Sequence, residues 1–306
     1  MNEVLSRGFL TIAFGPARYV EMAVGLCRSL KFHNPKACLA LVTDRVRPRL
    51  PDLFDHVIPL DTRLGTGVEQ KLQVDRYSPF EQTLFIDSDC LVFANPETLW
   101  DLYATANGLG VKGWAYLGPD DAHYGVQDMA SLLRACGVSR MGALNTGLFY
   151  FDRSPAAASV FSTARALAAR AAELGLKRFK TAAFADEPVF ALALEKNGIP
   201  MMPWDGGTAM STATAPDLQG LSAIQVHAGR RSLIRYATPT EPVVLHFHMQ
   251  AQDAWPYHRE LARLRLGPAH AWGALPALAA LPSYLQARAR YYLGRLKQKT
   301  RAFLPE

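Results

Sequence analysis

Short apolar segments alternate with longer amphipathic segments through the first 90 residues. Apolar runs of strand length cover residues 9–14, 39–43, 57–60 and 84–87. Apolar residues at helical spacing fill 19–32 and 69–77 between them. Strands that alternate with helices at this spacing are typical of βαβ units. The pattern therefore predicts an α/β protein with a mainly parallel sheet flanked by helices.

The later part of the chain is less regular. The segment over 144–151 predicts a strand entered through a polar turn, and residues 243–248 predict a late strand. Ser154 and Pro155 occupy the N-cap and first position of an Ala-rich helix that is expected to reach about residue 174. A further helix is expected over 186–197. The sequence shows neither an internal repeat nor a low-complexity linker before residue 265.

Two carboxylates, Asp87 and Asp89, directly follow the predicted strand at 84–87. Alternate side chains of a strand point the same way, so the two can share one face at the strand end. Such a pair is mutually repulsive unless a cation lies between them, and a hard divalent cation that bridges to a diphosphate fits best. An Asp-x-Asp segment is also common in turns and at helix N-caps. The buried strand that leads into it favours the metal site.

Composition sets limits on class and location. The chain has 306 residues, 49% of them hydrophobic, which suits one large α/β domain or two small ones. The N-terminus lacks a signal-peptide pattern, and no apolar run approaches the length of a membrane span. Four cysteines, at positions 27, 38, 90 and 136, lack C-x-x-C spacing and are expected to be reduced thiols. These features predict a cytoplasmic protein.

The net charge of +6 is concentrated at the C-terminus. Residues 283–306 contain six basic side chains and one acid, a charge of +5, which leaves +1 for the other 282 residues. No basic stripe interleaved with aromatics runs through the body of the chain, so nucleic acid is not an expected partner.

Five segments, taken in order, resemble the glycosyltransferase family 8 type of GT-A enzyme, which includes glycogenin-like and bacterial lipooligosaccharide galactosyltransferase-like proteins. They are Thr11-Ile12-Ala13-Phe14 with Tyr19 after it, Phe85-Ile86-Asp87-Ser88-Asp89 as the D-x-D motif, Leu144-Asn145-Thr146-Gly147-Leu148, Asp186-Glu187-Pro188-Val189, and His246-Phe247. The resemblance covers roughly residues 8–258.

This resemblance implies a GT-A nucleotide-sugar transferase domain over 1–260 and a basic helical tail over 261–306. It further implies a metal-dependent enzyme that moves a hexose from a nucleotide donor, by default a UDP-sugar, to a glycan or lipid-linked acceptor with retention. The implied cofactor is Mn²⁺ or Mg²⁺. The sequence names neither the sugar nor the acceptor.

The resemblance also implies a role for each matched residue near the donor. Asp87, Asp89 and His246 would bind the metal, a mixed carboxylate–imidazole set that suits Mn²⁺ or Mg²⁺. Asp87 would also contact the ribose, and Tyr19 would stack on the base. His248 points to the same side of its strand as His246, so the choice between them stays open, and His227 is a weaker third candidate.

Three further residues are expected near the transferred sugar, and a fourth near the diphosphate. Asp186 would lie near the sugar hydroxyls, and Glu187 near the anomeric carbon, where the family carries Gln. A carboxylate there can act as a nucleophile or stabilise an oxocarbenium-like transition state, and stabilisation with front-face attack is the preferred reading. Asn145 would hold the sugar or order the metal-binding strand. Lys71 adds a cation near the diphosphate. The ordinary alternatives are helix-capping acids, a turn asparagine and a solvated lysine.

Two segments depart from the family, and two other classes of protein share its fold. The first loop is Gly15-Pro16-Ala17-Arg18 where the family often has acids that read uracil, and the family's Lys-Pro-Trp near the end is absent. A sugar-nucleotide pyrophosphorylase would need a Gly-rich, Arg-containing first loop. A non-catalytic GT-A-fold binding protein is the other alternative, against which the complete Asp87, Asp89 and His246 set argues.

The tail at 281–304 predicts an amphipathic helix. Leu285, Tyr292, Leu296 and Phe303 fall near one side of it, and Arg290, Lys297 and Arg301 near the other, with Arg288, Arg295 and Lys299 flanking the apolar side. This pattern is typical of an interfacial helix on an anionic membrane, here the inner face of the membrane. A solvated helix or one that packs in a dimer is the alternative.

Overall fold

The computed structural model describes residues 5–46, 48–65, 67–178, 184–213, 224–229, 233–235 and 238–302. Its internal contacts divide the chain into two compact units. The first unit comprises Met1–Cys27, Lys36–Ser88 and Pro96–Gly206. The second unit comprises Arg28–Pro35, Asp89–Asn95 and Gly207–Glu306. The division into 1–260 and 261–306 expected from the sequence stays a prediction.

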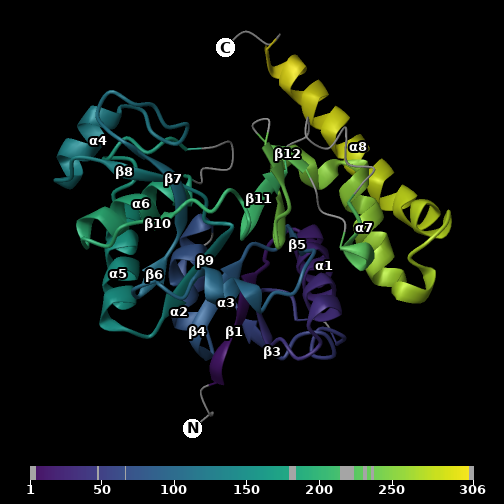
Figure 1. Cartoon of the computed structure of the whole chain (residues 1–306). Coiled ribbons are helices and arrows are strands. Elements are labelled where there is room, and N and C mark those ends of the chain that lie inside the picture. The colour runs from purple at the N-terminus through teal and green to yellow at the C-terminus, as the bar shows by residue number, and fades with distance from the viewer. Residues whose placement is uncertain are drawn as a thin grey trace. The chain divides into compact units, whose positions relative to one another are not determined.

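A six-stranded sheet in the order β3-β2-β1-β4-β9-β6 forms the centre of the first unit (Figure 1). Its strands are β1 (Leu5–Ile12), β2 (Leu39–Thr43), β3 (His56–Pro59), β4 (Phe80–Ile86), β6 (Leu109–Gly110) and β9 (Leu148–Asp152). The first four strands of the order pair in parallel, and β9 pairs antiparallel with β4 and β6. This arrangement confirms the predicted α/β class with a parallel-rich sheet.

The strand predicted over 144–151, entered through a polar turn, is confirmed as the turn at 145–147 and strand β9, whereas the strand that ends at Leu144 was not predicted. Strand β8 (Met141–Leu144) ends where Asn145 begins the turn, and β9 starts at Leu148. The Asn145 Oδ1 atom accepts a hydrogen bond from the Gly147 N–H at 2.8 Å, which closes an Asx turn. Strand β8 joins a separate sheet in the order β10-β7-β8, with β7 at Lys112–Leu117 and β10 at Met202–Pro203.

Helices of the first unit follow most of the predicted segments. They are α1 (Ala17–His33), which continues into the second unit, α2 (Val74–Tyr77), α3 (Thr98–Leu102), α4 (Met129–Cys136), α5 (Pro155–Ala169) and α6 (Asp186–Lys196), with 3-10 helices η1 (Thr62–Leu64) and η2 (Val68–Gln73). The Ser154 Oγ atom caps α5, as expected, but this helix ends at Ala169, five residues early. The helix predicted over 69–77 is mostly the 3-10 helix η2, followed by the single turn α2.

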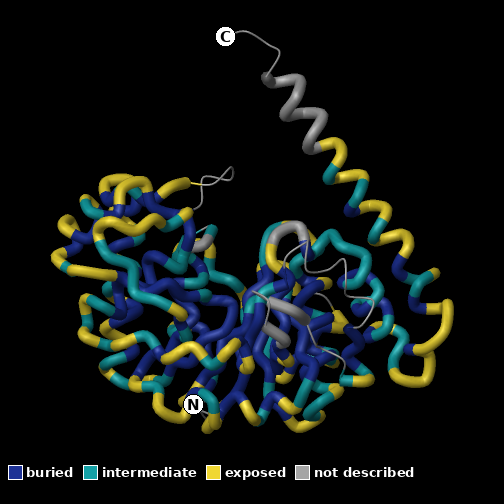
Figure 2. Tube along the Cα trace, turned by 45° about the horizontal axis from the view of Figure 1, so that its top comes forward, coloured by how far each residue is buried: buried dark blue, intermediate teal, exposed yellow. Residues whose placement is uncertain are grey.

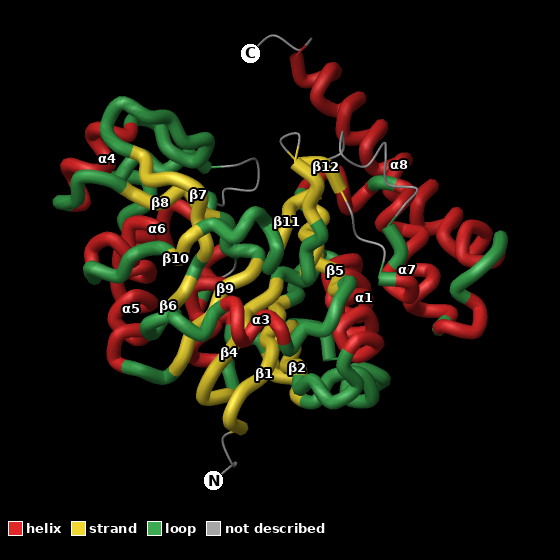
Figure 3. The backbone as a smooth tube through the Cα atoms, viewed as in Figure 1, coloured by secondary structure: helices red, strands yellow, loops and turns green. Residues whose placement is uncertain are grey.

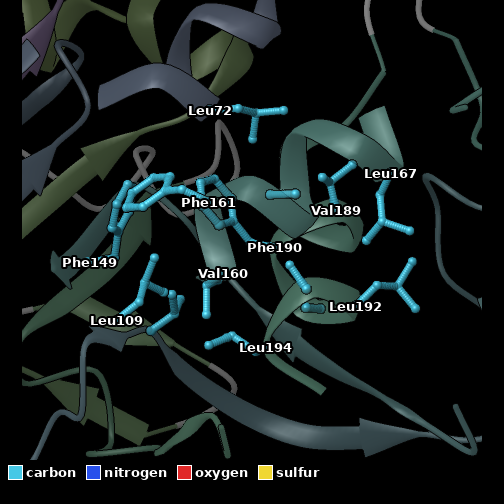
Figure 4. Close-up of a cluster of buried hydrophobic side chains, with 14 of the residues drawn as sticks. Leu72, Leu109, Phe149, Val160, Phe161, Leu167, Val189, Phe190, Leu192 and Leu194 are labelled. Carbon is cyan, nitrogen blue, oxygen red and sulfur yellow. The ribbon is translucent and has the colours of Figure 1, made fainter. Parts of the chain in front are cut away.

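An aromatic core fixes helices α5 and α6 against the central sheet. Phe149 of β9 stacks on Phe85 of β4 with ring centroids 4.8 Å apart. The Phe190 ring of α6 lies 5.3 Å from Phe149, and the Phe161 ring of α5 lies 5.8 Å from Phe190. Figure 4 shows Phe149, Phe161 and Phe190 of this cluster, and all four aromatic side chains are fully buried. Burial of each large side chain stabilises the fold by roughly 1.5–3 kcal/mol, so the end of β4 and the start of α6 are held firmly.

The second unit contains the sheet β11-β14-β5 and a helical C-terminal part. Its elements are β5 (Cys90–Val92), β11 (Met210–Ala213), β12 (Leu233–Arg235), β13 (Thr238–Thr240), β14 (Val244–Phe247), the helices α7 (Trp255–Leu266) and α8 (Leu275–Ala302), and the 3-10 helices η4 (Val226–Ala228), η5 (Met249–Asp253) and η6 (Pro268–His270). Strand β14 pairs antiparallel with β5 and parallel with β11. Helix α7 packs along α8, as Figure 3 also shows.

Helix α8 confirms the predicted C-terminal helix and presents two apolar faces. Ala280 and Ala287 are buried, whereas Leu278 and Leu285 are 62% and 59% exposed. Figure 2 shows buried and exposed positions alternating along this helix. Phe303 lies outside the described residues, as do the side chains of residues 294–302. Within the described part of the chain, no helix combines the length and the apolar character that a membrane span requires.

Candidate active site

Lys71 of η2 is the centre of a charged cluster in the first unit. Its Nζ atom lies 2.9 Å from each carboxylate oxygen of Asp87 and 3.0 Å from the Asp186 Oδ2 atom. It also donates a hydrogen bond to the Thr146 Oγ1 atom at 3.2 Å, and the Thr146 hydroxyl donates in turn to Asp186 at 2.5 Å. The lysine side chain is 11% exposed. Lys71 therefore forms ion pairs with two acids at once, and the solvated alternative does not describe it.

Each member of this cluster comes from a different element. Asp87 directly follows β4, and its N–H donates to the Gly147 carbonyl at 2.9 Å. Thr146 belongs to the Asx turn between β8 and β9. Asp186 is the first residue of α6, where the positive end of the helix dipole favours a carboxylate, and Ala185 takes the N-cap position without a side-chain cap. The acids therefore lie where parallel strands end and a helix begins, the usual place for a ligand in an open α/β sheet.

Electrostatics keep these groups charged. Burial alone would lower the pKa of the Lys71 ammonium, but the carboxylates of Asp186 and Asp87 together outweigh burial and raise that pKa above its usual value. Burial opposes ionisation of Asp186 as well, yet Lys71 and the Thr146 hydroxyl lower the pKa of its carboxyl group. The cluster is therefore a network of one ammonium and two carboxylates.

The pKa of Glu187 shifts in the opposite direction from that of Asp186. Burial and the neighbouring Asp186 charge raise the pKa of its carboxyl group to about 7, although a hydrogen bond from Tyr124 partly opposes the rise. The Tyr124 hydroxyl donates to the Glu187 Oε2 atom at 2.7 Å. Two adjacent acids thus differ in proton affinity, which is the arrangement that separates acid–base roles in many active sites. Asn145 is linked to these acids through its turn: its side-chain oxygen accepts from the Gly147 N–H, and the next residue, Thr146, donates to Asp186.

Sequence reasoning missed Thr146 and Tyr124. Thr146 was part of the Asn-Thr-Gly segment that carries the resemblance, and the polar turn expected there was the available signal. Tyr124 lies in a loop 63 residues before Glu187, and no local pattern marks it.

The loop after β1 is bound to the end of β2. The Gly15 N–H donates to the Asp44 Oδ2 atom at 3.0 Å, and the Arg45 guanidinium donates to the Gly15 carbonyl at 2.6 Å. The Arg18 guanidinium lies over the Tyr19 ring, 4.9 Å from its centroid, and also donates to the Tyr19 hydroxyl. The predicted base-stacking residue is thus already paired with a cation in the structure. Asp44 and Arg45 were not predicted.

The second unit contains its own group of possible metal ligands. The His246 Nε2 atom lies 3.3 Å from the Asp89 Oδ1 atom, and the Gln252 amide donates to Asp89 Oδ2 at 2.5 Å. Cys90 is opposite His246 in the β5–β14 pairing. The donor atoms of Asp89, Cys90 and His246 all lie within 4.8 Å of one another. The carboxylate and imidazole fit Mn²⁺ or Mg²⁺, and the buried thiol, which was expected only as a core residue, would suit a softer metal.

The other two histidines occupy different surroundings. His248 is exposed, and its ring centroid is 5.5 Å from that of His246. The His227 ring lies on η4 and packs against Phe32 at 4.6 Å. Of the three candidates, the structure brings His246 to Asp89.

Solved structures of other proteins have a fold similar to that of this chain. Its fold matches that of the bifunctional glycosyltransferase WbbM with a TM-score of 0.52 and 14% identity, over 86% of this chain and 51% of WbbM. It matches an active-site glutamine-to-glutamate mutant of LgtC with a TM-score of 0.52 and 12% identity, over 84% of this chain and 95% of LgtC. The chain has the GT-A fold.

A second LgtC structure, of this galactosyltransferase with donor and acceptor sugar analogues, matches equally well, with a TM-score of 0.52 and 13% identity. The chain spans about half the length of WbbM and nearly all of LgtC. No family model matches the sequence, and no curated protein does. The predicted resemblance to GT-A glycosyltransferases is thus confirmed at the level of the fold.

Proposed function

We propose that this protein is a metal-dependent glycosyltransferase. It transfers a hexose from a nucleotide donor, a UDP-sugar, to a glycan or lipid-linked acceptor, with retention at the anomeric carbon. The observation that carries the proposal is the cluster around Lys71. In this cluster one buried ammonium contacts Asp87, which follows β4, and Asp186, which begins α6, within a GT-A fold. Two glycosyltransferases with this fold, WbbM and LgtC, support the assignment.

In this proposal, Lys71 has a positioning and an electrostatic role. Its ammonium group orients both acids before substrate arrives, so no reorganisation is needed at the moment of reaction. It supplies positive charge next to Asp87, on the side of the site that receives the diphosphate. Asp186 accepts hydroxyl hydrogen bonds from the sugar, and Asn145 keeps the Thr146 turn in place.

Glu187 is the proposed residue nearest the anomeric carbon. A carboxylate here stabilises positive charge that develops on the sugar ring as the bond to the diphosphate breaks. LgtC, which shares the fold, has an active-site glutamine for which a glutamate mutant is known. Tyr124 keeps the carboxylate oriented and favours its charged form.

The proposed metal ligands are Asp87, Asp89 and His246. The ligand types present fit Mn²⁺ or Mg²⁺, and Asp89 and His246 are already adjacent. When bound, the metal supplies Lewis-acid stabilisation of the departing nucleoside diphosphate. Gln252 orients the Asp89 carboxylate through its amide hydrogen bond. Tyr19 is proposed as the residue that stacks on the base.

The two alternatives are less well supported. A pyrophosphorylase needs a phosphate-binding first loop, and here the Gly15 backbone is engaged by Asp44 and Arg45. A non-catalytic binding protein has no need for a buried lysine between two acids, which is costly to maintain unless it has a function.

The exposed side of α8 favours a membrane surface as a further partner. Leu278, Leu285 and Tyr292 are exposed on the helix, opposite the buried Ala280 and Ala287. Arg288 flanks this apolar stripe. An in-plane helix of this kind binds anionic lipid through its apolar stripe and basic flanks. We therefore include peripheral membrane association in the proposal.

Thermal unfolding with nucleoside diphosphates and sugar nucleotides tests the function. A ligand at 100 times its Kd stabilises the protein by about 2.7 kcal/mol. We expect UDP or a UDP-sugar to raise the Tm in the presence of Mn²⁺, and Asp89→Ala to abolish the Mn²⁺-dependent part. A Tm that no nucleotide changes would reject the transferase in favour of the binding-protein alternative.

A further inference from the structure

Two tryptophans of the first unit lie together on the surface. Trp114 is 57% exposed and Trp204 is 45% exposed. Their ring centroids are 6.2 Å apart, and the ring planes meet at 81°. Tryptophan has the largest apolar side chain and is mostly buried in folded proteins, so an exposed pair indicates a binding surface.

The local backbone directs both side chains outward. The pairing of β7 with β8 shifts register between Gly113 and Ala115, so Trp114 is the extra residue of a β-bulge. Bulges redirect side chains and are frequent beside active sites. Trp204 directly follows β10, whose Pro203 pairs with Gly113. The two rings therefore come from neighbouring strands of the β10-β7-β8 sheet.

Two features hold this arrangement in place: a close approach of the strands at Gly113 and an ion pair between Lys112 and Asp205. A Cβ atom at Gly113 would lie 2.3 Å from the Met201 Sδ atom and 2.8 Å from the Ala143 carbonyl oxygen, so the strands approach as closely as they do only because Gly113 has no side chain. The Lys112 Nζ atom lies 3.5 Å from the Asp205 Oδ2 atom, and both side chains are largely buried. This ion pair joins the residue before Gly113 to the residue after Trp204.

The tryptophan pair is close to the charged cluster through strand pairing. Gly113 pairs with Leu144, the last residue of β8. The next residues are Asn145 and Thr146, and the Thr146 hydroxyl contacts both Lys71 and Asp186. Paired strands lie about 4.8 Å apart, so the backbone that carries Trp114 is one strand away from the turn that carries Thr146.

We propose that Trp114 and Trp204 form an acceptor subsite that binds a neutral pyranose ring of the acceptor glycan. One face of a pyranose presents C–H groups that pack against an indole ring, and the indole N–H can donate to a sugar hydroxyl. The angle between the rings suits one sugar held against both of them. The inference rests on the proposed transferase function, because it names the substrate that meets the transferred hexose.

Saturation-transfer difference NMR tests the subsite with methyl β-D-galactopyranoside, methyl β-D-glucopyranoside and lactose as probes. We expect at least one probe to show enhanced transfer to the C–H protons of one ring face. Trp114→Ala and Trp204→Ala should each weaken the signal at least about fivefold, since an aromatic contact contributes that much to binding. Trp114→Tyr should retain most of it.

Trp272→Ala is the matched control, because Trp272 is 58% exposed and belongs to the second unit. It should leave the signal unchanged. Equal signals in the wild type and Trp114→Ala would overturn the subsite, as would the absence of transfer to all three probes. A wild-type dimer that Trp114→Ala converts to a monomer in sedimentation would overturn it in favour of a contact between copies.

The same proteins are then tested for the nucleotide-dependent rise in Tm. If the wild type and both tryptophan variants keep this rise while the glycoside signal is insensitive to the variants, only the subsite is rejected. If the wild type lacks the rise, the transferase function itself is rejected.

Discussion

The carboxylates of Asp87 and Asp89 are separated by one residue in the chain but belong to different units, and their surroundings differ. Both carboxylate oxygens of Asp87 lie 2.9 Å from a fixed ammonium, that of Lys71. Asp89 lies beside an imidazole, an amide and a thiol, from His246, Gln252 and Cys90. The first acid is neutralised by the protein itself. The second has the type of surroundings that a bound cation completes.

The contacts of Asp87 form when the protein folds, whereas the surroundings of Asp89 are completed only when a ligand binds. The Lys71 cluster is a folding element, so its removal should be visible in stability without any substrate. The Asp89 group should be nearly silent in stability until a metal or nucleotide is added. Variants in the two units can therefore be distinguished by the conditions under which they change the protein.

Lys71→Met should have the largest effect. It leaves Asp87 and Asp186 close together without a cation, which is expected to cost about 3 kcal/mol of unfolding free energy at pH 7.5 and to abolish transfer. Because Lys71 lowers the pKa of Asp186, its contribution is present above the ordinary Asp pKa and is lost as the pH falls through the lowered value. Urea unfolding at pH 7.5 and below pH 4 measures this.

Lys112→Met is the control for that variant, since Lys112 is equally buried but pairs with a single acid, Asp205. A loss of stability as large as that of Lys71→Met would show that any buried lysine has this effect, and would remove the special role of Lys71.

Glu187→Gln should have the next largest effect, and this variant should be more stable than the wild type where Lys71→Met is less stable. The folded-state pKa of Glu187, about 7, is above the ordinary value of 4.5. The folded protein thus binds more protons between these values, and stability from this group falls as the pH rises through that range. The variant should be more stable than the wild type by about 2 kcal/mol at pH 8, with no gain at pH 4.

Tyr124→Phe sharpens this test, because it removes the hydrogen bond that lowers the pKa of Glu187. The pH profile of stability should move to higher pH in this variant and lose its slope in Glu187→Gln. Identical profiles in the wild type and Tyr124→Phe would contradict the assigned contact. Transfer activity should fall in Glu187→Gln if the carboxylate stabilises charge on the sugar.

Asp89→Asn and His246→Gln should change metal binding with little change in basal stability. We expect the affinity for Mn²⁺, measured by the electron paramagnetic resonance of the free ion, to fall at least about tenfold in each. His248→Ala is the control, and it should bind Mn²⁺ as the wild type does. A loss in His248→Ala that equals the loss in His246→Gln would assign the ligand to the exposed histidine instead.

The smallest effect is expected at the C-terminal helix. Leu285→Glu places a charge on the exposed apolar stripe and should weaken binding to phosphatidylglycerol vesicles roughly fivefold to tenfold, the cost of one leucine contact. Val46→Glu is the control, since Val46 is 60% exposed in the first unit. Co-sedimentation with vesicles measures both. Unchanged vesicle binding in Leu285→Glu would favour a solvated or protein-packed helix.

Much of the fold could be predicted because its signals are local. The parallel strands and α6 are short periodic segments with clear ends, and Asp87 directly follows a buried strand. The end of α5 and the separate strand β8 could not be predicted in the same way. Strand β8 has only four residues and ends directly before the turn that the Asn145 amide closes, so its own sequence signal is weak.

Prediction of the site was limited by long-range contacts. Lys71 was expected as a cation near the diphosphate, but its simultaneous contact with Asp87 and Asp186 joins residues up to 115 positions apart, which no local pattern encodes. Tyr124 and Cys90 were missed for related reasons. The tyrosine is in a loop without periodicity, and the cysteine follows the apolar pattern of a buried strand, which indicates packing rather than a ligand.

The antiparallel register of β4 and β9 sets a length requirement on the segment between β8 and β9. Ile86 pairs with Leu148, so the last residue before Asp87 is fixed opposite the first residue after the turn. A slip of two residues would keep every side chain on its own face of the sheet, yet move the turn by about 7 Å along the strand. Thr146 would then lie beyond reach of Lys71. Insertions at this point are therefore expected to preserve both sheets and inactivate the protein.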